Sequence, residues 1–154
     1  MPGVAEFSIR PAHADEGETL REIAFEAKSH WGYDRAWVRS WVAQGDFSPS
    51  TLREREVLVA DADDSAVGFA SLIPRGEDCV LDDLWITPAW IGRGVGTKLF
   101  AGSAARAKEL GAKRLEWEAE PNAIGFYEKM GGEYLRDSEP TELGRVIPVM
   151  GLEL

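Results

Sequence analysis

The sequence predicts an α/β (α+β) domain with a mixed, mostly antiparallel sheet of about six or seven strands and helices on both faces. Short, mostly apolar segments recur between turn residues, as at 57–60 and 67–74, and indicate strands. Apolar residues at helical spacing indicate helices between them. One unit, at 81–119, runs strand, glycine loop, helix and strand, and such a crossover requires two neighbouring parallel strands.

The first half of the chain is expected to contain two helices before its main strands. Asp15 and Glu18 form a predicted capping box for the first helix, and Asp34 is expected to cap the second. The stretch 44–52 is rich in glycine, proline and hydroxyl residues, which predicts a loop. In chain order, the expected elements are a strand at 7–11, helices at 15–28 and 34–42, and strands at 57–60, 67–74 and 81–86.

The second half is expected to alternate helices with strands. Gly111 lies where a C-cap glycine belongs, and Asn122 is the predicted N-cap of a short helix that ends at Gly131. The expected elements are a helix from the glycine loop to about residue 110, a strand at 114–119, the short helix, and strands at 133–137 and 146–154.

Composition restricts the kind of protein. The chain has 154 residues, 44% of them hydrophobic, which suits one domain spanning 1–154. Cys79 is the single cysteine, so a reducing cytoplasm is expected. No membrane association is expected, because the sequence lacks an apolar run of about 18 residues and a signal peptide at 1–10. His13, His30 and Cys79 make no metal-binding spacing. The net charge of −10 argues against a nucleic-acid partner; it suits a cationic substrate, although solubility is the simpler explanation.

The stretch from Leu81 to Phe100 organises the chain. A strand stops at Pro88, three glycines follow at positions 92, 94 and 96, and an amphipathic helix begins after them. The first N–H groups of a helix lack internal partners and carry the positive end of the helix dipole. Glycine lets an anion approach this backbone closely. The pattern therefore predicts a phosphate cradle, the alternative being a glycine-rich turn without a ligand.

The order of residues in this cradle excludes two common phosphate motifs. In a Walker loop, lysine follows the last glycine directly, but here Thr97 separates Gly96 from Lys98. A dinucleotide fingerprint needs a third glycine at position 97 or 99, which is Thr97 or Leu99. The stretch resembles the acetyl-CoA loop of the GNAT superfamily of N-acetyltransferases, with Gly94 and Gly96 at its two small positions. Ile91 departs from the family, which places Gln or Arg there.

A second segment is similar to the same family. Asn122, Phe126, Tyr127 and Gly131 hold the places of the family's Asn, Phe-Tyr and Gly positions, whereas Gly132 replaces a final Phe. The order of elements is also that of the family. The chain is therefore identified as a member of the GNAT superfamily, which implies a GNAT-like fold and acetyl-CoA as co-substrate, without a metal.

The resemblance assigns most cofactor contacts to backbone groups. Residues 92–97 would hold the pyrophosphate, and residues 84–86 would pair with the pantetheine amide like an added strand. The expected cofactor-binding residues are Leu84, Trp85, Ile86, Gly92, Arg93, Gly94, Val95, Gly96, Thr97, Asn122 and Tyr127.

Acetyl transfer also needs an acid for the departing thiolate and a base for the amine. By resemblance, Tyr127 is the expected acid, the alternative being that it only packs its helix onto the sheet. Asp83 and Glu118 are the first candidates for the base, and another strand carboxylate or a water chain could replace them. Alternation along the strand places Asp83 on one face with Leu81 and Trp85.

By resemblance to the family, the acceptor wall is expected between the first two helices. His30, Trp31 and Tyr33 lie there, and aromatic rings could hold a cationic or apolar substrate or simply join the helices to the core. The resemblance thus implies direct transfer of acetyl from acetyl-CoA to a primary amine of a small molecule or peptide, in a ternary complex, by a monomer or homodimer. The alternative function is an acetyl-CoA sensor without catalysis.

Overall fold

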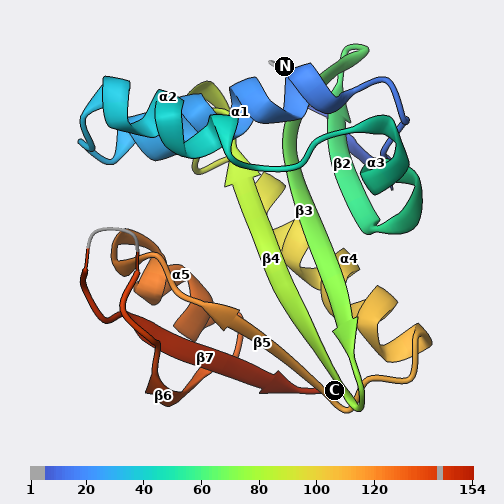
Figure 1. Cartoon of the computed structure of the whole chain (residues 1–154). Coiled ribbons are helices and arrows are strands. Elements are labelled where there is room, and N and C mark those ends of the chain that lie inside the picture. The colour runs from blue at the N-terminus through green and yellow to red at the C-terminus, as the bar shows by residue number, and fades with distance from the viewer. Residues whose placement is uncertain (1–5, 142–143) are drawn as a thin grey trace, which may run out of the picture. The chain divides into compact units, whose positions relative to one another are not determined.

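The computed structural model describes residues 6–141 and 144–154. No signal peptide is expected at 1–10, and residues 1–5 of that segment lie outside the described residues. In chain order the elements are β1 (Ser8–Pro11), α1 (Gly17–His30), α2 (Arg35–Ala43), α3 (Pro49–Glu54), β2 (Glu56–Ala62), β3 (Ser65–Arg75), β4 (Asp78–Ile86), η1 (Pro88–Trp90), α4 (Val95–Glu109), β5 (Arg114–Glu118), η2 (Pro121–Ala123), α5 (Ile124–Lys129), β6 (Glu133–Asp137) and β7 (Pro148–Glu153) (Figure 1). Within the described ranges, no helix is long and apolar enough to cross a membrane.

The strands form one sheet in the order β1-β2-β3-β4-β5-β7-β6. The β4 and β5 strands pair parallel, with Cys79 opposite Leu115, as the crossover at 81–119 predicts. The pairs β1–β2, β5–β7 and β6–β7 are antiparallel. The predicted fold class, a mixed and mostly antiparallel sheet with helices, is confirmed.

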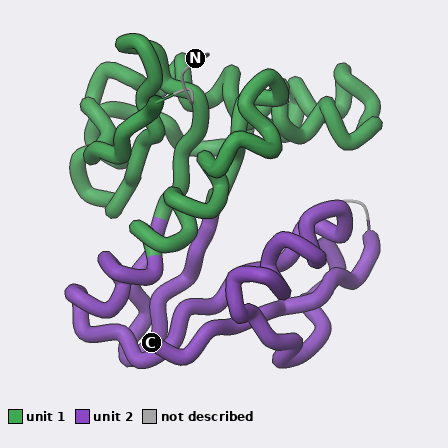
Figure 2. The backbone as a smooth tube through the Cα atoms, turned by 180° about the vertical axis from the view of Figure 1, so that it is seen from behind, with its two compact units in different colours: residues 1–71, 83–103 green, residues 72–82, 104–154 purple. Residues whose placement is uncertain are grey.

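The chain divides into two compact units (Figure 2). The first comprises Met1–Ser71 and Asp83–Ser103, and the second comprises Leu72–Asp82 and Ala104–Leu154.

The first unit has helices on both faces of its strands. Consecutive side chains of β2 point to opposite faces of the sheet, because side chains alternate along a strand. Val59 belongs to the core cluster with Leu20 of α1 and Val38 of α2. Leu58 lies on the other face, where its side chain is 3.4 Å from the position that a Cβ on Gly102 of α4 would take.

The second unit is built around β5 and β7. Leu115 and Trp117 of β5 and Met150 of β7 are buried together in the described core. Gly132 permits the close approach of α5 to this core. An added Cβ at Gly132 would lie 2.7 Å from the Trp117 ring and 2.9 Å from the Tyr127 carbonyl oxygen.

The predicted loop at 44–52 is wrong in its second half, where α3 forms. Ser48 is its N-cap and Pro49 is its first helical residue. The Ser48 hydroxyl accepts a hydrogen bond from the Thr51 backbone N–H at 3.4 Å. Proline at the first helical position replaces an N–H that has no partner there, so here it starts a helix.

Of the predicted helix caps, that at Asp34 is confirmed, since its carboxylate accepts from the Trp37 N–H at 2.9 Å. The predicted Asp15–Glu18 capping box is wrong, because α1 begins after Glu16. The Glu16 carboxylate instead binds both terminal nitrogens of Arg10 at 2.7 Å, which also lowers the pKa of Glu16. Asn122 is not an N-cap either: it lies within η2 and donates its side-chain N–H to Glu120 at 2.9 Å.

Candidate active site

The glycine loop between β4 and α4 presents unpaired backbone to its surroundings. Gly92 and Gly94 have φ angles of +80° and +87°, in the left-handed region that favours glycine. The first backbone hydrogen bond of α4 runs from the Lys98 N–H to the Gly94 carbonyl oxygen at 3.1 Å. The N–H groups of residues 95–97 precede that bond and therefore lie in the part of a helix that lacks internal acceptors.

Space for a ligand lies beside this loop. Among the described residues, no heavy atom is within 4 Å of a Cβ built on Gly92 or Gly94. Open space, a helix N-terminus and left-handed glycines together suit a phosphate group. The loop thus fits the pyrophosphate of acetyl-CoA.

A cation accompanies the loop. The Arg93 guanidinium lies 3.9 Å from the centre of the Trp90 ring, a cation–π contact with η1. Ile91, where related loops carry Gln or Arg, is 43% exposed. Ile91 carries no charge, and Arg93, two residues later, supplies a positive charge to the loop.

Asp83 is held among hydrogen-bond donors on β4. Its carboxylate accepts from the Ser71 hydroxyl at 2.6 Å and from the Trp85 indole N–H at 3.2 Å. The predicted shared face of Asp83 and Trp85 is thereby confirmed. The arrangement fixes the orientation of the Trp85 ring, because the ring's single donor is occupied.

The predicted acceptor wall is separated by the structure into two groups. His30 and Trp31 contact each other, with ring centres 5.2 Å apart, and Trp31 is 37% exposed. Tyr33 instead belongs to a second group of rings, and its ring centre lies 5.9 Å from that of Trp37. This group also contains the ring of Trp41, and the Lys28 side-chain nitrogen lies over it. The sequence alone predicts no site role for Lys28, Trp37 or Trp41.

The second unit holds the predicted acid. Tyr127 of α5 is buried, with its ring centre 5.0 Å from that of Trp117, whereas its neighbour Phe126 is only half-buried. Burial raises the pKa of Tyr127 well above its ordinary value, and the negative charge of Glu120 raises it further. The phenol therefore keeps its proton at neutral pH.

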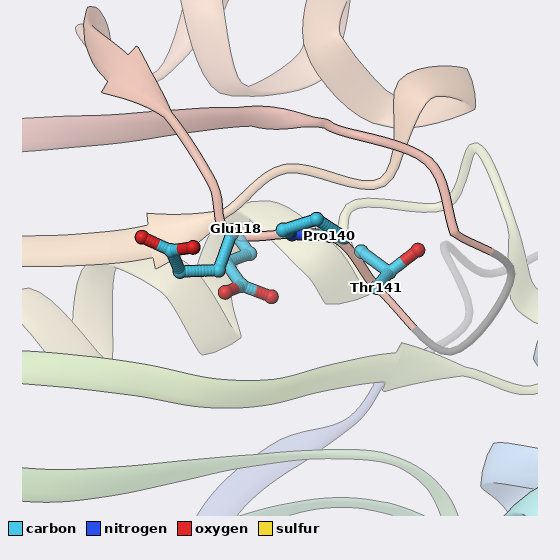
Figure 3. A pocket seen from close by; sticks show the side chains of 4 residues that line it. Glu118, Pro140 and Thr141 are labelled. Atoms are coloured by element: carbon cyan, nitrogen blue, oxygen red, sulfur yellow. The ribbon is translucent and has the colours of Figure 1, made fainter.

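The second unit also contains a pocket beside the end of β5. Glu118, Glu139, Pro140 and Thr141 line it, and its volume is about 410 Å³ (Figure 3). The Glu118 side chain is exposed there. Its carboxylate can accept a proton from an amine that enters the pocket.

Comparison with known proteins identifies the chain. The Acetyltransferase (GNAT) family model matches residues 17–132, so this chain belongs to the GNAT family of acetyltransferases. It is accordingly an enzyme of the acyltransferase class, an N-acetyltransferase that depends on acetyl-CoA.

Two curated relatives span nearly the whole chain. The peptidyl-lysine N-acetyltransferase YjaB of Salmonella typhimurium is 32% identical over 158 residues, covering 94% of this chain and 96% of that protein. The protein of the same name from Escherichia coli is also 32% identical and is covered to 95%.

A solved structure supports the fold. The PaiA N-acetyltransferase from Thermoplasma acidophilum, determined in complex with coenzyme A, superposes with a TM-score of 0.80. It is 22% identical, and the match covers 97% of this chain and 99% of that one.

Proposed function

We propose that this enzyme transfers the acetyl group of acetyl-CoA directly to a primary amine in a ternary complex. A lysine side chain of a peptide is the first acceptor to test, because the relatives of 32% identity are named for that acceptor. The observation that carries the proposal is the open loop before α4 in a chain of this family.

Acetyl-CoA supplies an activated acetyl group as a thioester, and the first unit holds the groups proposed to bind it. The N–H groups of residues 95–97 would bind phosphate oxygens, and Arg93 would add a charge-assisted contact. The backbone of Leu84, Trp85 and Ile86 would pair with the pantetheine amide as an added strand, as the family resemblance implies. Asn122 remains proposed as a further cofactor contact.

The proton balance assigns a role to Tyr127. As the new N–C bond forms and the C–S bond breaks, the amine loses one proton and the departing thiolate gains one. The Tyr127 hydroxyl, protonated at neutral pH, is the proposed donor. A thiolate held in the same apolar surroundings would also have its proton affinity raised, so the raised pKa of Tyr127 is compatible with this role.

For the base, the geometry favours Glu118 over Asp83. Asp83 already accepts hydrogen bonds from Ser71 and Trp85, which suits a residue that positions the Trp85 ring. Glu118 is exposed and lines a pocket. We therefore propose Glu118 as the group that takes the amine proton.

Direct transfer is favoured over an acetylated-enzyme intermediate on Cys79. Cys79 lies on β4 opposite Leu115 of β5 and has no exposed surface in the second unit. A thiol so enclosed cannot take an acetyl group from a bound thioester without opening the sheet. Initial-rate patterns that intersect when both substrates are varied are therefore expected, in place of the parallel lines of a double-displacement reaction.

The experiment that tests this function measures CoA release with a panel of lysine peptides and small amines. Tyr127→Phe removes one hydroxyl, and turnover should fall by about 10²–10⁴-fold while acetyl-CoA affinity changes little. Tyr134→Phe is the matched control, since the Tyr134 hydroxyl is exposed and bonded to Asp137.

The same experiment separates the enzyme from a sensor. Acetyl-CoA binding without CoA release for any amine would support a sensor. A fully active Tyr127→Phe enzyme would mean that another donor protonates the thiolate.

A further inference from the structure

Lys28 on α1 is buried, which is unusual for a lysine. The residue is only 8% exposed, although lysine is almost never buried unless its charge is compensated. Its side-chain nitrogen faces the rings of Trp41, Tyr33, Trp85 and Trp37, at 4.5, 4.8, 5.6 and 5.7 Å from their centres. All four distances are within the range of a cation–π contact, about 6 Å.

These four rings, here called the aromatic cage, come from three elements of the first unit. Tyr33 lies in the turn after α1, and Trp85 lies on β4. Trp37 and Trp41 are one turn apart on α2, and their rings stack with an interplanar angle of 20°. Trp41 meets the Trp85 ring edge to face, at 5.6 Å between centres. The cage is thus assembled in three dimensions around one ammonium group.

The cage is held rigidly on the strand side. The Trp85 indole donates to Asp83, which in turn accepts from Ser71 of β3. The orientation of the Trp85 ring is therefore fixed independently of Lys28. A rigid ring face keeps its attraction for a cation when the occupant changes.

The chemistry of the cage matches the chemistry of the acceptor. A lysine amine is protonated at neutral pH, with a pKa of about 10.4, so a site that recognises an acceptor lysine meets an ammonium first. The cage already holds that group, an alkylammonium on a four-carbon stem, supplied by the chain itself. It includes Trp85, one of the three β4 residues proposed to bind the cofactor.

We propose that the aromatic cage is the recognition site for the acceptor's alkylammonium group, and that Lys28 is an internal competitor occupying it. The acceptor enters the cage as the Lys28 head group leaves, and Lys28 thereby weakens acceptor binding. This inference rests on the proposed acetyl transfer for its biological meaning, but the cation site itself can be measured without catalysis.

The test uses tetramethylammonium as the probe and tryptophan fluorescence as the readout. Lys28→Ala removes the internal ammonium, so the variant should show saturable binding at least about tenfold tighter than the unaltered protein. Lys28→Arg keeps a cation in the cage and should bind as weakly as the unaltered protein. Lys108→Ala removes an exposed lysine on α4 and serves as the matched control.

A second variant covers the case in which Lys28→Ala does not fold. Lys28→Met keeps most of the apolar stem but ends short of the ammonium position, so it should also bind the probe. With a lysine peptide as acceptor, Lys28→Met should lower the KM for the peptide about fivefold or more and leave the KM for acetyl-CoA unchanged.

Two results would overturn the proposal. One is a folded Lys28→Ala or Lys28→Met protein that shows no saturable binding of tetramethylammonium. The other is an unaltered protein that binds tetramethylammonium as tightly as these variants do. Calorimetric titration with acetyl-CoA distinguishes failure of the cation-site proposal from failure of the proposed acetyl transfer. Tetramethylammonium binding in a protein that does not bind acetyl-CoA would sink the acetyl transfer and leave the cation site standing.

Discussion

Replacement of Gly94 by valine tests whether the loop before α4 binds acetyl-CoA. Gly94 has a φ of +87°, and its Cβ position faces open space among the described residues. A valine there meets no neighbour, so its effect on folding is limited to backbone strain. That strain costs at least about 1–2 kcal/mol for a residue with a side chain in the left-handed region.

Gly94→Val should also weaken the binding of acetyl-CoA, an effect separate from the loss of folding stability. A valine side chain at Gly94 would project into the open space beside the loop, where the phosphates are proposed to lie. A hydrogen bond to a charged group contributes about 1.5–3 kcal/mol. The loss of one such bond corresponds to a roughly 10–100-fold weaker affinity for acetyl-CoA.

Gly111, which follows the other end of α4, provides a matched control. Its φ is +90°, and the structure again places no described atom within 4 Å of an added Cβ. Gly111→Val should therefore lose similar stability in chemical denaturation, yet bind acetyl-CoA with unchanged affinity in calorimetric titration. If the two variants lose the same affinity, or if Gly94→Val loses none, the loop does not cradle the phosphates.

Two further predictions concern stability. Gly132→Ala should destabilise the protein by about 1–3 kcal/mol, because its Cβ would lie 2.7 Å from the Trp117 ring, whereas Gly125→Ala on α5 should stabilise it by about 0.5–1 kcal/mol. Thermal unfolding of both variants tests this, and equal shifts would contradict the packing argument. The Thr51 hydroxyl and the Ser48 backbone N–H lower the pKa of Asp46 to about 2. Because the pKa is lower in the folded state, this stabilisation is present above pH of about 4 and is lost as the pH falls toward 2. Denaturation at pH 7 and pH 3 should show the difference between the unaltered protein and Asp46→Ala shrinking at the lower pH; a constant difference would contradict the assignment.

The sequence predicts the strand, glycine loop and helix around residues 81–110 well, because each signal there is local. Pro88 ends pairing, the glycines supply left-handed φ angles, and apolar spacing marks the helix. The parallel pairing of β4 with β5 follows from the crossover between them. Such features need no knowledge of the rest of the fold.

Helix caps are predicted less well because side chains have competing partners. Glu16, rather than the predicted Asp15, precedes α1, and its carboxylate is held by Arg10 on β1. That ion pair depends on where β1 lies, which local sequence does not encode. The same holds for Asn122, whose amide binds Glu120 in place of the helix end.

In the candidate site, too, local features follow from the sequence, whereas contacts with distant partners do not. Alternation along β4 predicts that Asp83 and Trp85 share a face, and the hydrogen bond between them confirms it. Whether Asp83 is a base or a positioning residue depends on Ser71, a residue of another strand. Spacing alone could not identify that partner, since it is set by the register of the sheet.

The aromatic cage marks the limit of sequence reasoning most clearly. Leu20, Ala24 and Lys28 are spaced by four residues on α1, so the sequence already places Lys28 on the buried face. Trp37 and Trp41 have the same spacing on α2, which predicts that their rings lie together. What the spacing cannot predict is the turn between the helices. Gly32 adopts a φ of +92° there, and the return path that follows directs the rings of α2 toward the Lys28 ammonium. The cation site therefore arises from two predictable helix faces and Trp85 of β4, brought together by a turn geometry that only the folded chain defines.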